Sequence, residues 1–314
     1  MIKNCKILIT GGAGFIGSTL ANTLLPNNKV VVLDDLSMGD FSNLTQSLNL
    51  IPIKGSLTDR KLLSELLSKN DFDYIFHLGA IASVADSIAR PSETHEVNFE
   101  STLTLLELLR ENHKTLKRFI FSSSAAVYGN QPDLPKSENS PICPMSPYAI
   151  DKFASEQMAL IYQKLYGVPT SAVRFFNVFG PKQNPNSPYS GIISILVDKI
   201  KNFTDLTIFG DGEQARDFVY VEDVIQALLL VAICSESKGE VYNVGTGKLS
   251  TLNQIVKISS QITKREIPII YTEERMGDIR MSLSDITKLE TLGYVSEYDL
   301  ESGLREYLEY ELKK

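Results

Sequence analysis

The chain has 314 residues but only three cysteines, and it contains no CxxC motif. Cys5, Cys143 and Cys234 cannot pair evenly, which is typical of a protein in a reducing cytoplasm rather than of a disulfide scaffold. Histidine is equally scarce, and the three histidines are too widely spaced along the chain for a local zinc motif. We therefore expect a cytoplasmic protein without a metal site, and neither a disulfide-rich domain nor a zinc module.

Long apolar runs and an excess of positive charge are also missing. The longest aliphatic stretch, residues 228–234, is far shorter than the roughly 18 apolar residues that a membrane span needs. Residues 1–10 lead directly into a strand pattern and lack the apolar core and cleavage site of a signal peptide. With 31 basic and 38 acidic residues the net charge is −7, so neither nucleic acid nor a membrane is an expected partner.

The chain does contain an alternation of short apolar runs with longer helical patterns. The runs are continuous rather than alternating, which is typical of parallel strands covered by helices on both faces. They predict strands at residues 6–10, 30–34, 73–78, 118–122 and 171–175. Helices are predicted between them at residues 15–25, 59–68, 97–111 and 148–166. This order predicts an α/β fold with a Rossmann-like, doubly wound parallel sheet.

A segment rich in glycine, proline and asparagine, residues 180–191, interrupts the alternation. Beyond it the predicted elements are shorter and less regular. We therefore predict one domain over residues 1–178 and a smaller C-terminal α/β domain mainly over residues 179–314. Segments near residues 221–250 are expected to return to the first domain.

A glycine-rich sequence connects the first predicted strand to the first predicted helix. Gly11, Gly14 and Gly17 form a GxxGxxG pattern, and GxGxxG is also satisfied from Gly12. Such small residues let the backbone approach a pyrophosphate, whose charge then lies at a helix N-terminus. Taken alone, the same pattern is about as often an ordinary glycine-rich turn.

Two carboxylates after the second predicted strand favour the nucleotide interpretation. Asp34 lies 20 positions after Gly14, where a carboxylate accepts hydrogen bonds from a ribose hydroxyl. Asp35 adds a second negative charge, and no arginine follows nearby, so a 2′-phosphate would be repelled. The sequence therefore predicts a site for NAD rather than NADP.

Three further residues have the chemistry of an acid/base site. Tyr148 and Lys152 are four residues apart on one predicted helix, so they share a face. The ammonium can stabilise a tyrosinate and lower the pKa of Tyr148 from its usual value near 10. Ser124, after the fourth strand, can hold a substrate oxygen or relay its proton. A lone YxxxK is more often an exposed helical pair, and a serine run is more often a polar turn, so this prediction depends on the glycine loop.

The same helix carries an apolar stripe whose role stays open. Ala154, Met158, Ile161 and Leu165 follow one another at helical spacing. The stripe predicts packing, either within the core of the chain or across the seam of a dimer.

In combination these features resemble the extended short-chain dehydrogenase/reductase family. The resemblance depends on the glycine loop, Asp34, the serine run, YxxxK and residues 174–180, and on two later stretches, residues 216–223 and 275–278. It covers nearly the whole chain and is strongest to the UDP-sugar 4-epimerases. It implies tightly held NAD, a UDP-sugar substrate, and a homodimer joined through helices near residues 100–112 and 148–166.

The resemblance also assigns roles to residues. It implies that Tyr148 is the catalytic base, that Lys152 supports it and binds the nicotinamide ribose, and that Ser124 assists. Residues implied to bind substrate are Ser124, Tyr148, Asn177, Arg216, Arg275 and Ser282. The two arginines would hold the pyrophosphate, because an acidic protein needs local guanidinium groups to bind a dianion. Residues implied to bind the cofactor are Gly11, Gly14, Phe15, Ile16, Gly17, Asp34, Asp35, Ser56, Leu57, Leu78, Ala80, Tyr148 and Lys152.

Among the reactions of the family, the resemblance favours epimerisation at C4 through a transient 4-keto sugar. Dehydratases and decarboxylases need a further carboxylic acid just after the position of Ser124, where this chain has Ala125 and Ala126. Ser282 matches a position where a bulky tyrosine narrows the sugar pocket, and a serine there leaves space for an N-acetyl group. UDP-GlcNAc and UDP-GalNAc are therefore the expected substrates, alongside UDP-glucose and UDP-galactose.

Two departures from the family pattern concern the affinity for the cofactor. Ser56 stands where a carboxylate is expected to accept from the adenine amino group, and residues 77–82 lack a lysine found near the phosphates. Three other functions stay open on the same fold: a UDP-uronic acid 4-epimerase, a reductase that releases its product, and a non-catalytic NAD-binding sensor.

Overall fold

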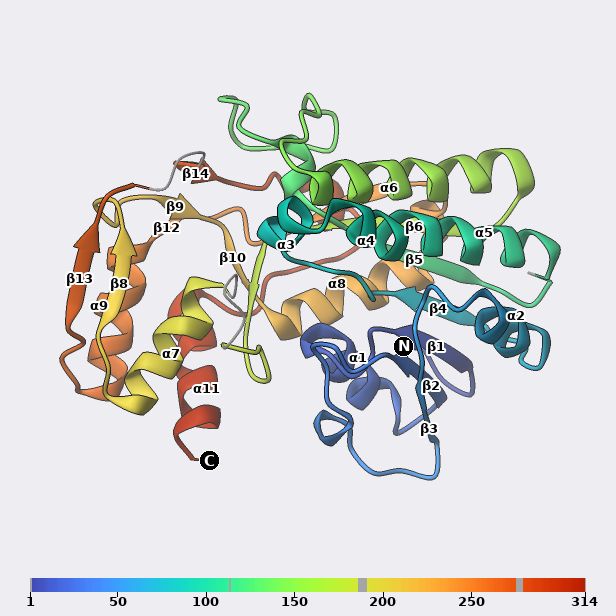
Figure 1. Ribbon diagram of the computed structural model, residues 1–314, viewed down its shortest axis with the longest axis horizontal. Helices are drawn as coiled ribbons and strands as arrows, with labels where there is room; N and C mark the ends of the chain where they lie inside the picture. The colour runs from blue at the N-terminus through green and yellow to red at the C-terminus, as the bar shows by residue number, and fades with distance from the viewer. Residues whose placement is uncertain (1, 113, 186–190, 275–278, 314) are drawn as a thin grey trace.

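The computed structural model describes residues 2–112, 114–185, 191–274 and 279–313 (Figure 1). Its centre is a seven-stranded sheet in the order β11-β6-β5-β4-β1-β2-β3, in which every neighbouring pair is parallel. The strands are β1 (Lys6–Thr10), β2 (Lys29–Asp34), β3 (Leu50–Lys54), β4 (Tyr74–His77), β5 (Arg118–Ser124), β6 (Thr170–Phe175) and β11 (Val241–Val244). The predicted Rossmann-like parallel sheet is therefore confirmed.

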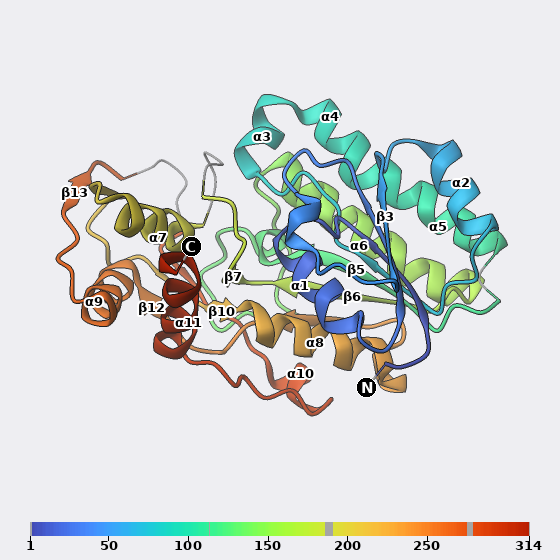
Figure 2. The ribbon, with the colours of Figure 1, turned by 90° about the horizontal axis from the view of Figure 1, so that it is seen from below.

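Helices cover both faces of this sheet, which Figure 2 shows from below. On one face lie α1 (Phe15–Leu24) and α8 (Val221–Ile233), and on the other lie α2 (Arg60–Ser68), α5 (Ser101–Glu111) and α6 (Pro147–Tyr166). Successive residues of a strand point to opposite faces, so Ile7 and Ile9 pack with α1 while Leu8 packs with α2 and α5. Helices cover both faces, so the side chains on both are buried, which explains why the strands are continuous apolar runs.

Four elements of this first lobe differ from the prediction. The edge strand β3 was not predicted, because most of its side chains are exposed and Pro52 interrupts its apolar pattern. Two short helices, α3 (Val84–Ala89) and α4 (Pro91–His95), were also missed. The helix predicted at residues 97–111 begins one residue earlier as a π-helix, η2 (Glu96–Glu100), and continues as α5.

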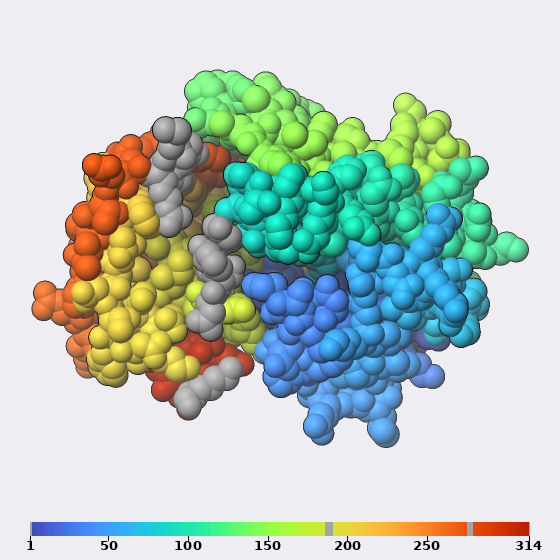
Figure 3. Space-filling view, in the orientation of Figure 1, coloured from blue at the N-terminus to red at the C-terminus, as the bar shows by residue number. Residues whose placement is uncertain are grey.

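A second lobe lies to the left of the sheet in Figure 1. It has its own apolar core, in which α7 (Ile192–Asn202), α9 (Leu252–Thr263) and α11 (Leu300–Leu312) pack on the parallel pair β8 (Leu206–Phe209) and β13 (Ile269–Thr272). Figure 3 shows a furrow between this lobe and the sheet lobe.

Two further small sheets lie outside the large sheet. β7 (Asn177–Phe179) pairs in parallel with β10 (Phe218–Tyr220). β9 (Ala215–Arg216) pairs with β12 (Ser250–Thr251) on one side and with β14 (Met281–Ser282) on the other. Three later elements belong to the first lobe. Directly after β10, α8 packs beside α1 and β11 extends the large sheet. After β14, Leu289 of α10 (Thr287–Glu290) packs into the apolar cluster that α1 and α8 form with the sheet. In the described residues, no helix is both long and apolar enough to cross a membrane.

Candidate active site

The glycine-rich loop turns directly from β1 into α1 at the carboxyl edge of the sheet. Gly11 has a φ of +66°, and a Cβ at this position would lie 2.6 Å from Gly79 Cα, beyond the end of β4. A Cβ on Gly17 would collide with the Gly11 carbonyl oxygen. Only glycine therefore fits these two positions. Gly14 is the N-cap of α1, whose first turn, Phe15, Ile16 and Gly17, presents N–H groups that have no acceptor within the helix.

Asp34 ties the end of β2 to this loop. Its carboxylate is buried, with Oδ2 accepting from the Ala13 N–H at 2.9 Å and Oδ1 accepting from the Leu36 N–H at 2.9 Å. Asp35 is exposed and accepts from the Ser37 N–H at 2.8 Å. A buried carboxylate beside a helix N-terminus is the arrangement that a dinucleotide requires for its ribose and pyrophosphate.

The other residues predicted to contact the cofactor follow the ends of neighbouring strands. Ser56 and Leu57 come after β3, while Leu78 and Ala80 come after β4. The Ser56 hydroxyl is bonded to its own turn, with Thr58 Oγ1 at 2.9 Å and the Thr58 N–H at 3.1 Å. Leu57 Cδ1 packs so closely on Gly79 that a Cβ there would lie 2.7 Å away. The ends of β1, β3 and β4 thus meet at one edge of the sheet.

The three residues predicted to be catalytic also come together. Tyr148 lies in the first turn of α6, which starts at the N-cap Ser146, and Ser124 stands at the end of β5, close enough for its hydroxyl to lower the pKa of the Tyr148 phenol. Lys152 follows one turn later, and its Nζ donates to the Ser122 carbonyl oxygen at 2.8 Å. All three side chains are therefore anchored between α6 and β5.

Burial dominates the electrostatics of this group. It raises the pKa of Tyr148, and the neighbouring Ser124 hydroxyl only opposes that rise. It lowers the pKa of Lys152 to about 7, against the attraction of the Asp151 carboxylate. The prediction that Lys152 lowers the pKa of Tyr148 is wrong for this structure. The Lys152 ammonium lies 6.0 Å from the centre of the tyrosine ring and bonds to Ser122 instead, so desolvation is the larger effect.

The residues predicted to bind substrate form a second group around the small sheets. Ser282 is the register partner of Arg216 in the β14–β9 pair. Asn177 starts β7, two residues after Phe175, which is the register partner of Ser124 in the β6–β5 pair. The structure therefore places Asn177 at the same edge of the large sheet as Ser124. Arg275 lies outside the described residues.

One residue that sequence reasoning missed joins this second group. Asp217 follows Arg216, and its carbonyl oxygen accepts from the Asn177 side chain at 3.0 Å. Its N–H donates to the Ser282 carbonyl oxygen at 2.8 Å. The available signal was an acidic residue directly after a predicted anion-binding arginine, which by itself indicates no particular role.

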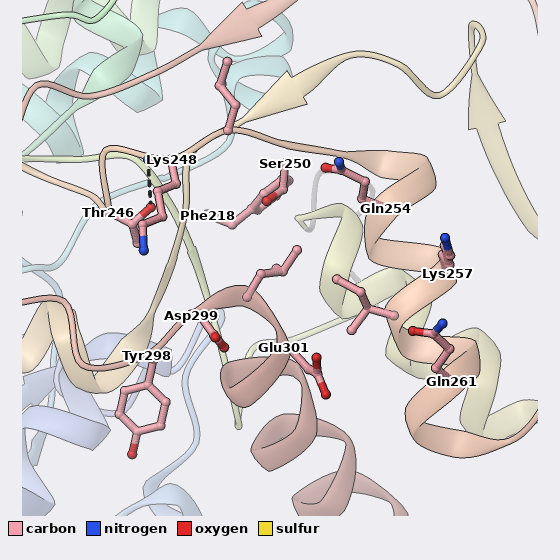
Figure 4. A pocket seen from close by; sticks show the side chains of 13 residues that line it. Phe218, Thr246, Lys248, Ser250, Gln254, Lys257, Gln261, Tyr298, Asp299 and Glu301 are labelled. Carbon is pink, nitrogen blue, oxygen red and sulfur yellow. Dashed lines mark hydrogen bonds between the residues drawn. The ribbon is translucent and has the colours of Figure 1, made fainter.

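A pocket of about 540 Å³ lies in the second lobe between α9 and the start of α11 (Figure 4). Its charged lining consists of Lys248, Lys257, Asp299 and Glu301, so neither sign of charge prevails. None of the predicted site residues lines it. Among the described residues, no group of three or more histidine, cysteine, aspartate or glutamate side chains is arranged to hold a metal ion.

Comparisons with known proteins show the family to which the chain is similar. The model of the "NAD dependent epimerase/dehydratase family" matches residues 7–245. The structure of a UDP-N-acetylglucosamine 4-epimerase from Methanobrevibacter ruminantium M1, in complex with UDP-N-acetylmuramic acid, is 39% identical over 99% of each chain, with a TM-score of 0.94. The UDP-glucose 4-epimerase of Thermotoga maritima with UDP-glucose is 36% identical, with a TM-score of 0.92 over 98% of this chain and 99% of that chain.

A third solved structure carries a different sugar. The UDP-glucuronic acid 4-epimerase from Bacillus cereus, in complex with UDP-glucuronic acid and NAD, is 30% identical. Its TM-score is 0.89 over 98% of this chain and 99% of that chain.

Proposed function

The chain belongs to the NAD-dependent epimerase/dehydratase family, as the motifs predicted, and on that premise we propose that it inverts C4 of UDP-hexoses through a transient 4-keto sugar. The observation that carries the proposal is that the hydroxyls of Ser124 and Tyr148 are neighbours, with Lys152 one turn away, at the edge of the sheet that holds the glycine loop. The chain is an NAD-dependent enzyme, and its solved relatives are isomerases that act on UDP-sugars.

The residues present fit NAD. Gly11 and Gly17 leave no room for a side chain where the pyrophosphate must approach the backbone, and Asp34 is placed to accept from a ribose hydroxyl. Bound NAD supplies reversible hydride transfer at C4 of the sugar. Lys152, at the base of the same edge, binds the nicotinamide ribose in this proposal.

Proton transfer belongs to the chain itself. As a tyrosinate, Tyr148 accepts the proton of the C4 hydroxyl. After the keto sugar has turned its opposite face towards the cofactor, Tyr148 returns the proton to the C4 oxygen, and Ser124 relays it or holds that oxygen. The raised pKa of Tyr148 and the lowered pKa of Lys152 both follow from burial, which supports a desolvated site around the reacting oxygen.

The chain has no carboxylic acid just after Ser124, where elimination and decarboxylation would need one. Ala125 and Ala126 start the short 3₁₀ helix directly after Ser124, and a methyl group can neither donate nor accept a proton. The hydroxyl pair and the cofactor are sufficient for epimerisation, because every proton and hydride that leaves the sugar returns to it.

We infer that the substrates are UDP-GlcNAc and UDP-GalNAc, alongside UDP-glucose and UDP-galactose. Ser282 is small, half-buried and opposite Arg216, which supports space for an N-acetyl group beside the pyrophosphate site. Similarity to the M. ruminantium enzyme supports the same choice. Similarity to the B. cereus enzyme keeps a UDP-uronic acid 4-epimerase as the second candidate.

We also propose a homodimer formed through α5 and α6. The apolar stripe of α6 divides in the structure: Met158 packs into the core of the first lobe, while Ile161 and Leu165 are exposed, as is Ile150 on the same helix. Exposed apolar side chains in a row indicate a contact surface. The three cysteines are free thiols, which supports a cytoplasmic location.

The division of the chain follows from the same proposal. Residues 1–178 hold NAD, together with segments near residues 221–250 that lie against the large sheet. Residues 179–314 mainly hold the UDP-sugar. The pairing of β11 with β6 and the packing of α8 beside α1 support this division.

The test is a substrate panel followed by NMR. Purified protein without added NAD is incubated with UDP-galactose, UDP-GalNAc and UDP-galacturonic acid, and the anomeric proton signals of the 4-epimers are measured. Conversion of the N-acetylated sugar supports the proposal, and conversion of the uronic acid alone favours the second candidate. Unchanged spectra for all three would refute epimerase activity. Stoichiometric consumption of external NADH would instead identify a reductase.

A further inference from the structure

Asp217 lies among the residues proposed to bind the substrate, Asn177, Arg216 and Ser282. It is the single residue between β9, which carries Arg216, and β10, which pairs with the strand that starts at Asn177. It therefore connects the β7–β10 sheet to the β12–β9–β14 sheet. Its side chain is completely buried.

The carboxylate accepts hydrogen bonds from five neutral donors. Oδ1 accepts from the Thr246 N–H at 2.9 Å and from the Thr246 hydroxyl at 2.7 Å. Oδ2 accepts from the Gly247 N–H at 3.0 Å, the Ser284 N–H at 3.3 Å and the Ser284 hydroxyl. Three of the donors are backbone groups, which cannot reverse their polarity as a hydroxyl can. Figure 4 shows Thr246 beside the pocket of the second lobe, where its hydroxyl also accepts from the Lys248 N–H.

The backbone of the same residue holds two residues of the proposed substrate site. Its carbonyl oxygen accepts both from the Asn177 N–H at 3.1 Å and from the Asn177 side-chain amide at 3.0 Å. Its N–H donates to Ser282 at 2.8 Å. Asp217 is therefore bonded to the start of β7, to the loop at residues 246–247 and to β14 and the residues just after it.

We propose that Asp217 is the positioning residue of the nucleotide-sugar side of the site. Through it, Asn177, Arg216 and Ser282 keep one geometry, although its own carboxylate is turned into the protein and away from substrate. The inference rests on the proposed function, because that function assigns these three residues to the UDP-sugar. Its physical basis is that a buried carboxylate surrounded by fixed N–H groups holds those groups strongly, since each would otherwise be unpaired.

Asp217→Asn tests the proposal with almost no change of volume. One end of the amide presents an NH₂ group to donors that faced a carboxylate oxygen, so at least one backbone N–H loses its acceptor. We expect the KM for the UDP-sugar and the Kd for UDP, measured by titration calorimetry, to rise by roughly 10- to 100-fold. We expect kcat to stay within about threefold and bound NAD to be unchanged, because Asp34 and the glycine loop are untouched.

Asp223→Asn is the matched control. Asp223 is also buried and accepts from the Ser296 hydroxyl at 3.0 Å, the Glu297 N–H at 2.9 Å and the Tyr298 N–H at 3.2 Å. Its bonds are therefore of the same kind, with three donors instead of five, but the segment that it holds carries none of the proposed site residues. A purely structural role for Asp217 predicts the same loss of stability in both variants and no selective rise of KM in either.

Two outcomes would overturn the proposal: a KM and UDP Kd of the Asp217→Asn protein within twofold of wild type, or an equal rise in the Asp223→Asn protein. If wild type turns over no UDP-hexose, the proposed function fails while the UDP titration still decides the role of Asp217. If the Asp217→Asn protein does not fold, Ser284→Ala replaces it, because it removes one hydroxyl donor only. A rise of about threefold in the UDP Kd is then expected, and no rise would contradict the positioning role.

Discussion

The buried imidazole of His77 makes the stability of the folded chain sensitive to acid. It ends β4, with Nδ1 at 2.8 Å from Thr10 Oγ1 and Nε2 at 3.0 Å from Thr102 Oγ1. The Thr102 hydroxyl donates to the Asn98 carbonyl oxygen at 2.9 Å, so it accepts from the Nε2–H. Nδ1 then accepts from the Thr10 hydroxyl. The neutral imidazole is fully paired. A second proton, on Nδ1, would force the Thr10 hydroxyl to turn its own proton away and would bury a charge whose two bonding partners are both neutral hydroxyls.

The magnitude follows from the pKa. Burial, with a smaller contribution from the charge of Lys152, lowers the pKa of His77 from 6.5 to about 3. Below pH 6.5 His77 is protonated in the unfolded chain, whereas in the folded chain it stays neutral down to about pH 3. The free energy of unfolding therefore falls as the pH falls through this window. The slope approaches about 1.4 kcal/mol per pH unit, and the loss from pH 6.5 to 4.5 is about 2.3 kcal/mol.

The assay is urea unfolding with excess NAD at steps from about pH 7.5 to 4.5, applied to wild type, His77→Gln and Phe119→Leu. Glutamine keeps one donor and one acceptor but does not titrate, so we expect this variant to lose about 2.3 kcal/mol less than wild type between pH 6.5 and 4.5. Phe119 is buried and its ring centre lies 5.7 Å from that of His77, so its truncation should shift the whole profile without changing its slope. Parallel profiles of wild type and His77→Gln would refute the reasoning.

Three further substitutions test the chemistry and the core. Tyr148→Phe removes the hydroxyl that moves the proton in the proposed reaction, so turnover by NMR should fall by roughly 10²- to 10⁴-fold while NAD stays bound; near-normal turnover would exclude its role. Ser282→Tyr should lower the turnover of UDP-N-acetylhexosamines selectively, and equal losses on UDP-hexoses assayed in parallel would exclude a gate. Glu156 accepts two hydrogen bonds from the buried guanidinium of Arg174, at 2.6 and 2.9 Å, and Glu156→Gln removes the negative charge that balances this guanidinium. We expect urea unfolding to show a loss of about 3 kcal/mol, and a loss below about 1 kcal/mol would contradict this.

The sheet could be predicted where strands are buried on both faces. β1 and β2 alternate between two apolar cores, so every position selects an apolar residue and the run is unmistakable. β3 lies at the edge, with three of its five residues exposed, so its sequence carries no such run. The π-helical turn at Glu96–Glu100 has no sequence signature that differs from an ordinary helix, which is why the start of that helix was misplaced.

The cofactor side of the site could be predicted because its geometry is local. Gly11 and Gly17 are six residues apart in one turn, and Asp34 ends the next strand, so a βαβ unit brings them together without help from the rest of the chain. The pKa of Tyr148 could not be predicted in this way. Its sign depends on how deeply α6 and β5 bury the hydroxyl, and the spacing of Tyr148 and Lys152 says nothing about burial.

Asp217 shows why part of the substrate side could not be predicted. Its carboxylate bonds reach residues 29 to 67 positions away along the chain, and its carbonyl bond to Asn177 spans 40 positions. Most of these partners are backbone groups, which every non-proline residue possesses and which therefore impose no residue type on the sequence. The only visible trace is one acidic residue after Arg216, and solvated aspartates beside arginines are common on surfaces. What distinguishes Asp217 is the number of fixed donors that converge on it, so its importance should appear as a change in substrate affinity that Asp223→Asn does not reproduce.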